Sequence, residues 1–217
     1  MYPRLQRIPP SLLRTFAEGC YVDSPVYFNA SALVRWLNWT KLERLLAMSG
    51  QGENLRVLDF ACGNGVMFPT WEKGFQNTVA IDLHVTAAER VCKYYGLKKV
   101  HLTKANGTLL PFPPATFDLV FAASTLEHFP DLSEPLREVH RVLRVGGSML
   151  FLCPNENRFY DWGRRIARYQ KPPDHYHTAA EVLSVVGGFF KVEAVSNFPS
   201  CCPPFLSIYR MGKATKD

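Results

Sequence analysis

The segment Val57-Leu-Asp-Phe-Ala-Cys-Gly-Asn-Gly65 constrains the fold more than any other part of the chain. An apolar run that ends at Phe60 and carries one acid, Asp59, is typical of a buried strand. A turn of small residues follows, and small residues let the backbone approach a ligand closely. The predicted helix after the turn offers unpaired N–H groups at its start. Because open α/β sheets bind ligands at the carboxyl ends of their strands, the segment predicts a ligand pocket there.

Apolar runs alternate with helical patterns along the rest of the chain. The runs typical of strands are residues 55–60, 78–82, 99–103, 117–123, 148–153, 189–195 and 205–211. Helical patterns occupy residues 11–48, 67–73, 87–95, 132–143 and 178–186. This alternation predicts an α/β fold with a doubly wound, mostly parallel sheet of seven strands. The last two runs are joined without room for a crossover helix, so we expect one antiparallel strand at or near the edge.

Length and composition indicate one decorated domain. The chain has 217 residues, and we expect a helical extension and lid over 1–50, a core over 51–217 and a lid insertion at about 155–178. A net charge of +6 with 47% hydrophobic residues excludes disordered and low-complexity classes. The six cysteines form no C-x-x-C pair, which argues against structural zinc. No signal peptide or bilayer span is evident, so we expect a reduced, cytoplasmic protein.

A second acid stands at the spacing of a nucleoside pocket. Asp82 ends the second predicted strand 17 residues after Gly65. Acids that hydrogen-bond a ribose lie at about 20 residues from the glycine turn. The dinucleotide fingerprint needs a third glycine, but Phe68 stands in its place. Asp59 would repel a pyrophosphate and suit a cation, so the two acids favour a nucleoside that carries positive charge.

These motifs resemble those of class I S-adenosylmethionine-dependent methyltransferases, in the small-molecule group that includes ubiquinone- and menaquinone-type enzymes. The D-x-G-x-G-x-G motif of the family appears at 59–65, with Ala61 for the first glycine. This exchange is mild if Ala61 keeps a negative φ. Asn106 replaces the aspartate that binds adenine, and its amide oxygen can still accept a hydrogen bond. Further matches in the order of the family are Leu110-Pro-Phe112, Phe117-Asp118 and residues 124–131 and 136–147.

The resemblance implies a Rossmann-like methyltransferase fold and S-adenosylmethionine as the cofactor. It implies methyl transfer to a small-molecule or lipid- or glycan-linked acceptor. Oxygen is the favoured target, since the N/D-P-P-Y/F signature of nitrogen methylation is absent where Ser124-Thr-Leu-Glu127 stands. The residues implied for cofactor binding are Asp59, Ala61, Gly63, Gly65, Asp82, Leu83, Asn106, Gly107 and Ser124.

Three histidines are candidates for the chemical step. His128 follows the fourth predicted strand, where the acceptor pocket should open, and a histidine there can act as a general base. Alternatively it fixes the turn or contacts the methionine end of the cofactor. His175 and His177 precede the helix at 178–186 and are candidates for acceptor contact or acid–base catalysis. A His-x-His metal site lacks an evident set of further ligands, so no metal is expected.

The insertion predicts an amphipathic helix. Its apolar stripe is Phe159, Trp162, Ile166 and Tyr169, with Arg164, Arg165 and Arg168 elsewhere on the helix. One interpretation is a solvated lid, and the other is a surface for an anionic acceptor or a lipid headgroup, with peripheral membrane contact. Nucleic acid is disfavoured as a partner because the cations of one short helix make a small footprint. The oligomeric state stays open.

Other functions also stay open at this point. The missing third glycine disfavours a nicotinamide-dependent dehydrogenase. A non-catalytic subunit could keep the pocket for S-adenosylmethionine, because a fold does not establish chemistry. A methyltransferase that acts on protein or RNA would share the pocket, although the chain has no recognisable RNA-binding appendage.

Overall fold

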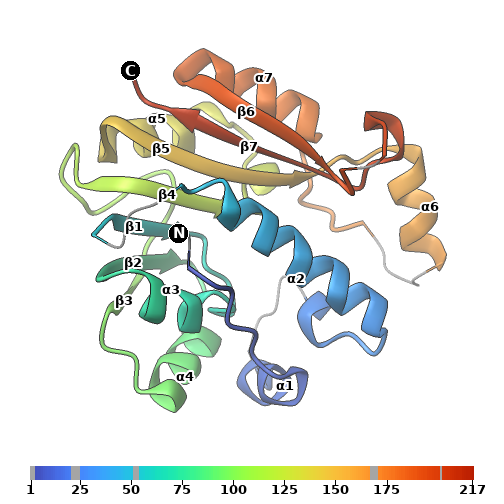
Figure 1. The fold of residues 1–217 in the computed structure, drawn as a ribbon, viewed down its shortest axis with the longest axis horizontal. Coiled ribbons are helices and arrows are strands. Elements are labelled where there is room, and N and C mark those ends of the chain that lie inside the picture. Colours follow the sequence, from blue (N-terminus) through green and yellow to red (C-terminus); the bar gives the residue numbers. More distant parts are fainter. Residues whose placement is uncertain (1–2, 21–24, 51–53, 167–170, 201) are drawn as a thin grey trace.

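One mixed sheet of seven strands organises the molecule, in the order β3-β2-β1-β4-β5-β7-β6 (Figure 1). The computed structural model describes residues 3–20, 25–50, 54–166, 171–200 and 202–217. The strands are β1 (Arg56–Phe60), β2 (Asn77–Asp82), β3 (Val100–Lys104), β4 (Phe117–Ala123), β5 (Leu143–Pro154), β6 (Lys191–Phe198) and β7 (Tyr209–Thr215). β7 is antiparallel to β5 and to β6, while β1 to β5 pair in parallel. The expected doubly wound α/β fold with one reversed strand near the edge is confirmed.

Helices cover both faces of the sheet (Figure 1). One face is covered by α1 (Pro10–Ala17), α2 (Ala32–Ala47), α3 (Phe68–Gly74) and α4 (Thr86–Tyr95), and the other by α5 (Ser133–Val142) and α7 (Ala179–Phe189). α6 (Arg158–Ile166) follows β5 and contacts the short 3₁₀ helix η3 (Pro204–Leu206). Two further 3₁₀ helices are η1 (Pro25–Phe28) and η2 (Leu126–His128). Within the described ranges, no helix is long and apolar enough to cross a bilayer.

The central strands β1 and β4 are buried on both sides, which explains why they read as continuous apolar runs. Val57, Leu58 and Phe60 of β1 are each at most 1% exposed. Trp71 of α3 is fully buried and packs edge-on against Phe121 of β4, with ring centroids 5.0 Å apart. Close packing of α3 on the sheet holds the turn that joins β1 to α3 in a defined place.

The start of β5 differs from the sequence expectation. A helix was expected to reach residue 143 and a strand to begin at 148, but α5 ends at Val142 and β5 begins at once at Leu143. Leu143 pairs with Phe117, and the register then shifts before Ser148 pairs with Leu119. Gly146 lies in this irregular stretch at φ 76°, a conformation that glycine adopts readily.

The terminal parts also differ in their boundaries. The helical region expected at 11–48 is divided into α1, η1 and α2. The last strand was expected at 205–211, but η3 occupies the start of that run and β7 spans Tyr209–Thr215. The apolar residues near 205 therefore belong to a connection, which a pattern of hydrophobicity does not distinguish from a strand.

Candidate active site

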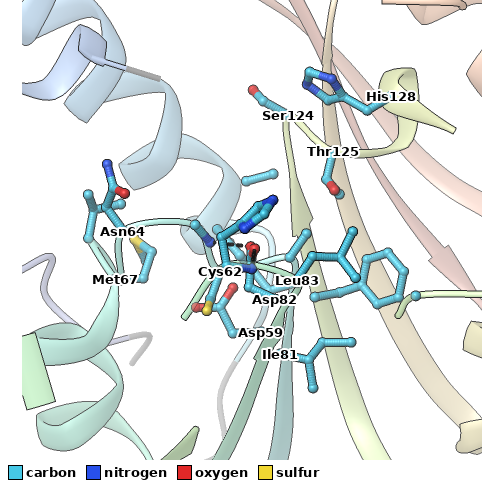
Figure 2. A pocket seen from close by; sticks show the side chains of 18 of the residues that line it. Asp59, Cys62, Asn64, Met67, Ile81, Asp82, Leu83, Ser124, Thr125 and His128 are labelled. Atoms are coloured by element: carbon cyan, nitrogen blue, oxygen red, sulfur yellow. Dashed lines mark hydrogen bonds between the residues drawn. The ribbon is translucent and has the colours of Figure 1, made fainter. Parts of the chain in front are cut away.

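A cavity of about 330 Å³ opens at the carboxyl ends of the parallel strands (Figure 2). Its walls include Asp59 at the end of β1, Asp82 at the end of β2, Asn106 after β3 and Ser124 after β4. Lys41 of α2 adds a wall from the N-terminal part of the chain. This is the edge of the sheet at which ligands bind in α/β folds.

Asp82 joins the end of β2 to the turn after β1. Its Oδ2 accepts a hydrogen bond from the backbone N–H of Gly63, and its Oδ1 accepts one from His84, both at 2.8 Å. Each oxygen of an ionised carboxylate can accept a second bond. Asp82 lines the cavity and is 8% exposed. It therefore has free acceptor positions toward the cavity for the hydroxyl groups of a ligand.

Asp59 lies beneath the same turn. Its Oδ2 accepts a hydrogen bond of 2.7 Å from Trp71 Nε1. Burial raises the pKa of Asp59 to about 7, the Trp71 bond opposes this rise, and the charge of Asp82 adds to it. Figure 2 places the two carboxyl groups close together below the turn at Cys62. A nearby cation favours the ionised form of such a group, so this corner of the cavity suits a cationic ligand.

The turn between β1 and α3 is left-handed at Ala61, Gly63 and Gly65, whose φ values are 58°, 53° and 70°. The condition for a mild exchange at residue 61, a negative φ, is therefore not met. A left-handed conformation costs a residue with a Cβ about 1–2 kcal/mol. Gly65 does not line the cavity, but a Cβ there would lie 2.9 Å from the Phe68 ring. The absence of a side chain at Gly65 therefore lets the turn pack closely against Phe68.

Ala61→Gly is expected to raise the free energy of unfolding by about 0.5–1 kcal/mol. Relief of about 1–2 kcal/mol of backbone strain outweighs the larger entropy of glycine in the unfolded chain. Urea unfolding of both proteins measures the difference. Ala115, which is exposed and has φ 54°, provides a matched control, and Ala115→Gly should give a similar gain away from the cavity. A lower midpoint for Ala61→Gly would contradict the strain.

The segment after β3 forms an apolar wall. Asn106 Oδ1 accepts a hydrogen bond from the backbone N–H two residues further on, at 3.0 Å, which leaves its NH₂ group and one lone pair for a ligand. At Gly107 a Cβ would lie 2.5 Å from the Phe60 ring and 2.9 Å from the Phe129 ring. The missing side chain therefore lets both rings close this wall. Leu83, which also lines the cavity, is half exposed beside it.

Ser124 and Lys41 form a polar wall on another side. Ser124 Oγ accepts a hydrogen bond of 3.3 Å from Lys41 Nζ. The same ammonium group lies 3.9 Å from the centre of the Tyr209 ring. Burial lowers the pKa of Lys41 to about 7, while the charge of Glu127 opposes the change. Near neutral pH this amine can therefore either donate or accept a proton.

Sequence reasoning missed Lys41, although a signal existed. Lys41 stands between Leu37 and Leu45 at spacings of four residues, so it lies on the apolar stripe of its own helix. A single charge on a stripe that faces the core requires a buried partner or a functional role. Tyr27, which also lines the cavity, comes from the same N-terminal part and carries no comparable signal.

The structure separates the three candidate histidines. His128 lines the cavity, and its Nδ1 lies 2.8 Å from Asp174 Oδ2. The His175 ring meets the His128 ring edge-on at 4.7 Å, behind the cavity wall. His177 instead donates from Nε2 to the backbone carbonyl of Phe129 at 3.0 Å and does not line the cavity. His128 is thus placed to meet a ligand, and His177 has a structural contact.

The insertion after β5 differs from the expected cationic surface. Arg164 is 5% exposed, pairs with Glu156 and Asp161, and lies 4.5 Å from the Tyr160 ring. Arg164 therefore does not support the interpretation as an anion-binding surface, because the carboxylates of Glu156 and Asp161 pair with its guanidinium group. Arg168, Tyr169 and the side chain of Ile166 lie outside the described residues.

The apolar side of the insertion is exposed in part. Phe159 and Trp162 are 39% and 60% exposed on α6. The cavity itself receives Asp174 from the end of the insertion. Of the described residues in 155–178, Asp174 lines the cavity and those of α6 do not.

Comparisons with known proteins agree with this geometry. A family described as a methyltransferase domain matches residues 58–151. The chain is 31% identical over 107 residues to malonyl-[acyl-carrier protein] O-methyltransferase of Pseudescherichia vulneris, and the alignment covers 49% of this chain and 42% of that protein. It is 26% identical over 180 residues to demethylmenaquinone methyltransferase of Listeria welshimeri, and the alignment covers 77% of this chain and 70% of that protein. Residues 58–151 thus match a methyltransferase domain, and the relatives and solved structures support a class I S-adenosylmethionine-dependent methyltransferase.

The fold is shared with a solved methyltransferase structure. A crystal structure of an S-adenosylmethionine-dependent methyltransferase from Aquifex aeolicus superposes with a TM-score of 0.68 at 20% identity, over 97% of this chain and all of that one. The chain spans about two fifths of the length of the P. vulneris relative. What the whole protein acts on is therefore a matter for proposal.

The cavity fits S-adenosylmethionine, the cofactor of this family. Asp82 has free carboxylate positions for hydroxyl groups, Asp59 offers negative charge for a cationic ligand, and a side chain at Gly107 would collide with the apolar wall. The predicted cofactor residues that line the cavity are Asp59, Ala61, Gly63, Asp82, Leu83, Asn106, Gly107 and Ser124. Their individual contacts with the cofactor stay predictions.

Proposed function

We propose that this chain transfers a methyl group from S-adenosylmethionine to an oxygen atom of a small, largely apolar acceptor. The observation that carries the proposal is one cavity with acidic groups at one wall and Ser124, Lys41 and His128 at another. When bound, the cofactor supplies the electrophilic methyl group. The residues of the chain bind and orient the two reactants, and orientation alone can provide much of the rate.

The polar wall supports an oxygen target. Ser124, Lys41 and His128 can each hydrogen-bond a hydroxyl group. Lys41 can also take up its proton near neutral pH, since its pKa is lowered to about 7. The relative from P. vulneris is named as an O-methyltransferase, which is consistent with this target.

Exposed apolar side chains support a lipid-like acceptor or peripheral contact with a membrane. Leu33 and Trp36 of α2, Trp162 of α6 and Phe205 of η3 are all more than half exposed. These elements lie on the side of the molecule toward which β5 runs, as does the cavity (Figure 1). Concentrations of exposed apolar groups mark contact surfaces for apolar partners.

Methyl-labelled S-adenosylmethionine and fractionated cell extract test the proposal. We expect the lipid or small-molecule fraction to gain label above a control extract that lacks this protein. Label in the protein or nucleic-acid fraction would contradict the acceptor class. No label, with cofactor binding verified by calorimetry, would favour a non-catalytic subunit. Release of labelled methanol by alkali then identifies a methyl ester, and release of labelled methyl iodide by hot hydriodic acid distinguishes a methyl ether from a carbon-bound methyl group.

The exposed tryptophans should contribute to membrane contact. We expect Trp36→Ser combined with Trp162→Ser to reduce cosedimentation with phospholipid vesicles about fivefold, which corresponds to about 1 kcal/mol of lost apolar burial. Val145 is 73% exposed near the start of β5, at the other end of the sheet. Val145→Ser is therefore the matched control and should leave sedimentation unchanged. Equal sedimentation of all three proteins would contradict a role for this surface.

A further inference from the structure

Glu127, His128 and His175 form a cluster that the proposed methyl transfer does not require. Each residue offers one ligand atom, and the three atoms lie within 4.8 Å of one another. Glu127 and His128 belong to η2, and His175 belongs to the segment before α7. The backbone N–H of Tyr176 donates to the carbonyl of Glu127 at 2.9 Å, which holds the two segments together.

The burial and the hydrogen bonding of the Glu127 carboxylate are unusual for a residue with a purely structural role. Glu127 is fully buried, and within the described ranges neither of its carboxylate oxygens has a hydrogen-bond partner of normal geometry. The neighbouring Cys153 thiol is a weak donor, and burial raises the pKa of Glu127. A buried acceptor without a partner is costly, so its retention points to a ligand that the carboxylate would bind.

Both histidines of the cluster are oriented by carboxylates. His128 Nδ1 lies 2.8 Å from Asp174 Oδ2, and His175 Nδ1 lies 2.8 Å from Glu156 Oε1. Because a carboxylate accepts, each Nδ1 carries the proton, and the neutral ring keeps its lone pair on Nε2. Histidines that bind metal ions show the same arrangement, in which the second ring nitrogen donates to a carboxylate.

The second carboxylate is itself held in place. Glu156 Oε2 accepts a hydrogen bond of 2.6 Å from the buried Arg164. The orientation of His175 therefore rests on an internal ion pair and does not depend on an exposed side chain. Such support for a ligand's orientation is typical of a built metal site.

We propose that Glu127, His128 and His175 bind a divalent transition-metal ion of the zinc type. Two imidazoles and one carboxylate form a donor set that zinc and similar ions use in catalytic sites, where further positions stay open. Ion–ligand bonds of about 2.0–2.2 Å require the three ligand atoms to move somewhat closer together. The ion would lie next to the cavity, because His128 belongs to both. The pair His175-x-His177 does not supply the site, since His177 donates to a backbone carbonyl.

Zinc binding to the untagged, chelator-treated 217-residue chain tests the proposal. Competition with a chromophoric chelator should give one tight site per chain, with a dissociation constant in the micromolar range or below. Cobalt(II) at the same site should give visible absorption bands of nitrogen and oxygen coordination without the strong near-ultraviolet bands of thiolate ligands. Millimolar Mg²⁺ should not compete, because imidazole donors favour transition metals.

Variants assign the site to these residues. Glu127→Gln and His175→Gln should each weaken zinc binding at least about tenfold, and Asp174→Asn, which acts on the orientation of His128, by about tenfold. His177→Gln is the matched control and should bind zinc as the wild type does. Thermal unfolding without metal verifies that each variant is folded, and only folded variants are compared.

Two results would overturn the metal site. One is the absence of saturable zinc binding by the wild type at 100 µM, a concentration about two orders of magnitude above the micromolar constant expected here. The other is unchanged affinity in both folded ligand variants, which would place the zinc elsewhere. Calorimetry with S-adenosylmethionine on the same samples keeps the two proposals apart, because cofactor binding without zinc binding would leave the proposed function intact.

Discussion

Asp82→Ala is expected to weaken the binding of S-adenosylmethionine by a factor of ten to a hundred. A hydrogen bond to a charged group contributes about 1.5–3 kcal/mol, and each 1.4 kcal/mol corresponds to about a tenfold change in affinity. The variant also leaves the Gly63 N–H without its acceptor, so the turn after β1 loses one tie to β2, while the Cys62 N–H still donates to the Ile81 carbonyl. Isothermal titration calorimetry with S-adenosylmethionine measures the loss directly.

Two further variants isolate the contribution of the carboxylate. Asp82→Asn keeps one acceptor oxygen without the charge, and its affinity should lie between the wild type and Asp82→Ala. Asp118→Ala is the matched control, because Asp118 likewise accepts from a backbone N–H, that of Arg56, but does not line the cavity. It should leave affinity unchanged. If folded Asp82→Ala bound the cofactor as the wild type does, the assignment of Asp82 would be wrong.

That Asp59, Asp82 and Asn106 line one cavity was predictable because local sequence determines their placement. Asp59, Asp82 and Asn106 each follow or end a parallel strand, and the carboxyl ends of neighbouring strands meet at one edge of the sheet. Three consecutive strand-and-turn motifs therefore bring these residues together whatever covers them. Ala61 contains a further signal, since the family places glycine there and the turn is left-handed at that residue.

The cavity wall with Lys41, Ser124 and His128 was not predictable in the same way, because residues far apart in sequence assemble it. Lys41 reaches Ser124 from α2 across a separation of 83 residues, and His175 reaches Glu127 from the segment before α7. No local pattern reports which helix will cover the carboxyl end of β4. Arg164 shows a related limit, since its hydrophilic character predicts exposure, while it is buried and pairs with the buried Glu156 and the half-exposed Asp161.

Binding of S-adenosylmethionine is expected to strengthen about tenfold between pH 6 and pH 8. The pKa of Asp59 is raised to about 7, so its carboxyl group is mostly neutral at pH 6 and mostly ionised at pH 8. If the cationic cofactor binds the ionised form, affinity follows the ionised fraction, which rises about tenfold over this interval. Calorimetry at several pH values in buffers of different ionisation enthalpy measures both the affinity and the proton released.

Lys41 titrates in the same range and must be separated from Asp59. Its pKa is lowered to about 7, and loss of its positive charge at higher pH would also favour a cation in the cavity. Asp59→Asn retains an oxygen for the Trp71 hydrogen bond and should remove most of the pH dependence, while Lys41→Met should leave most of it. The same slope in Asp59→Asn as in the wild type would assign the dependence to Lys41.

The pH dependence of the free energy of unfolding gives an independent measure of the ionisation of Asp59. The folded pKa of Asp59 lies above its ordinary value of 3.8, so the folded chain holds the proton more tightly than the unfolded chain does. The stability that this proton confers is fully present below pH 3.8, falls as the pH rises toward 7 and is lost above it. Asp59→Asn should therefore raise the unfolding midpoint relative to the wild type at pH 7.5 and less so at pH 5. At pH 7.5, S-adenosylmethionine should raise the unfolding midpoint of the wild type more than that of Asp59→Asn. The reason is that an ionised Asp59, which is unfavourable in the free protein, becomes favourable beside a bound cation.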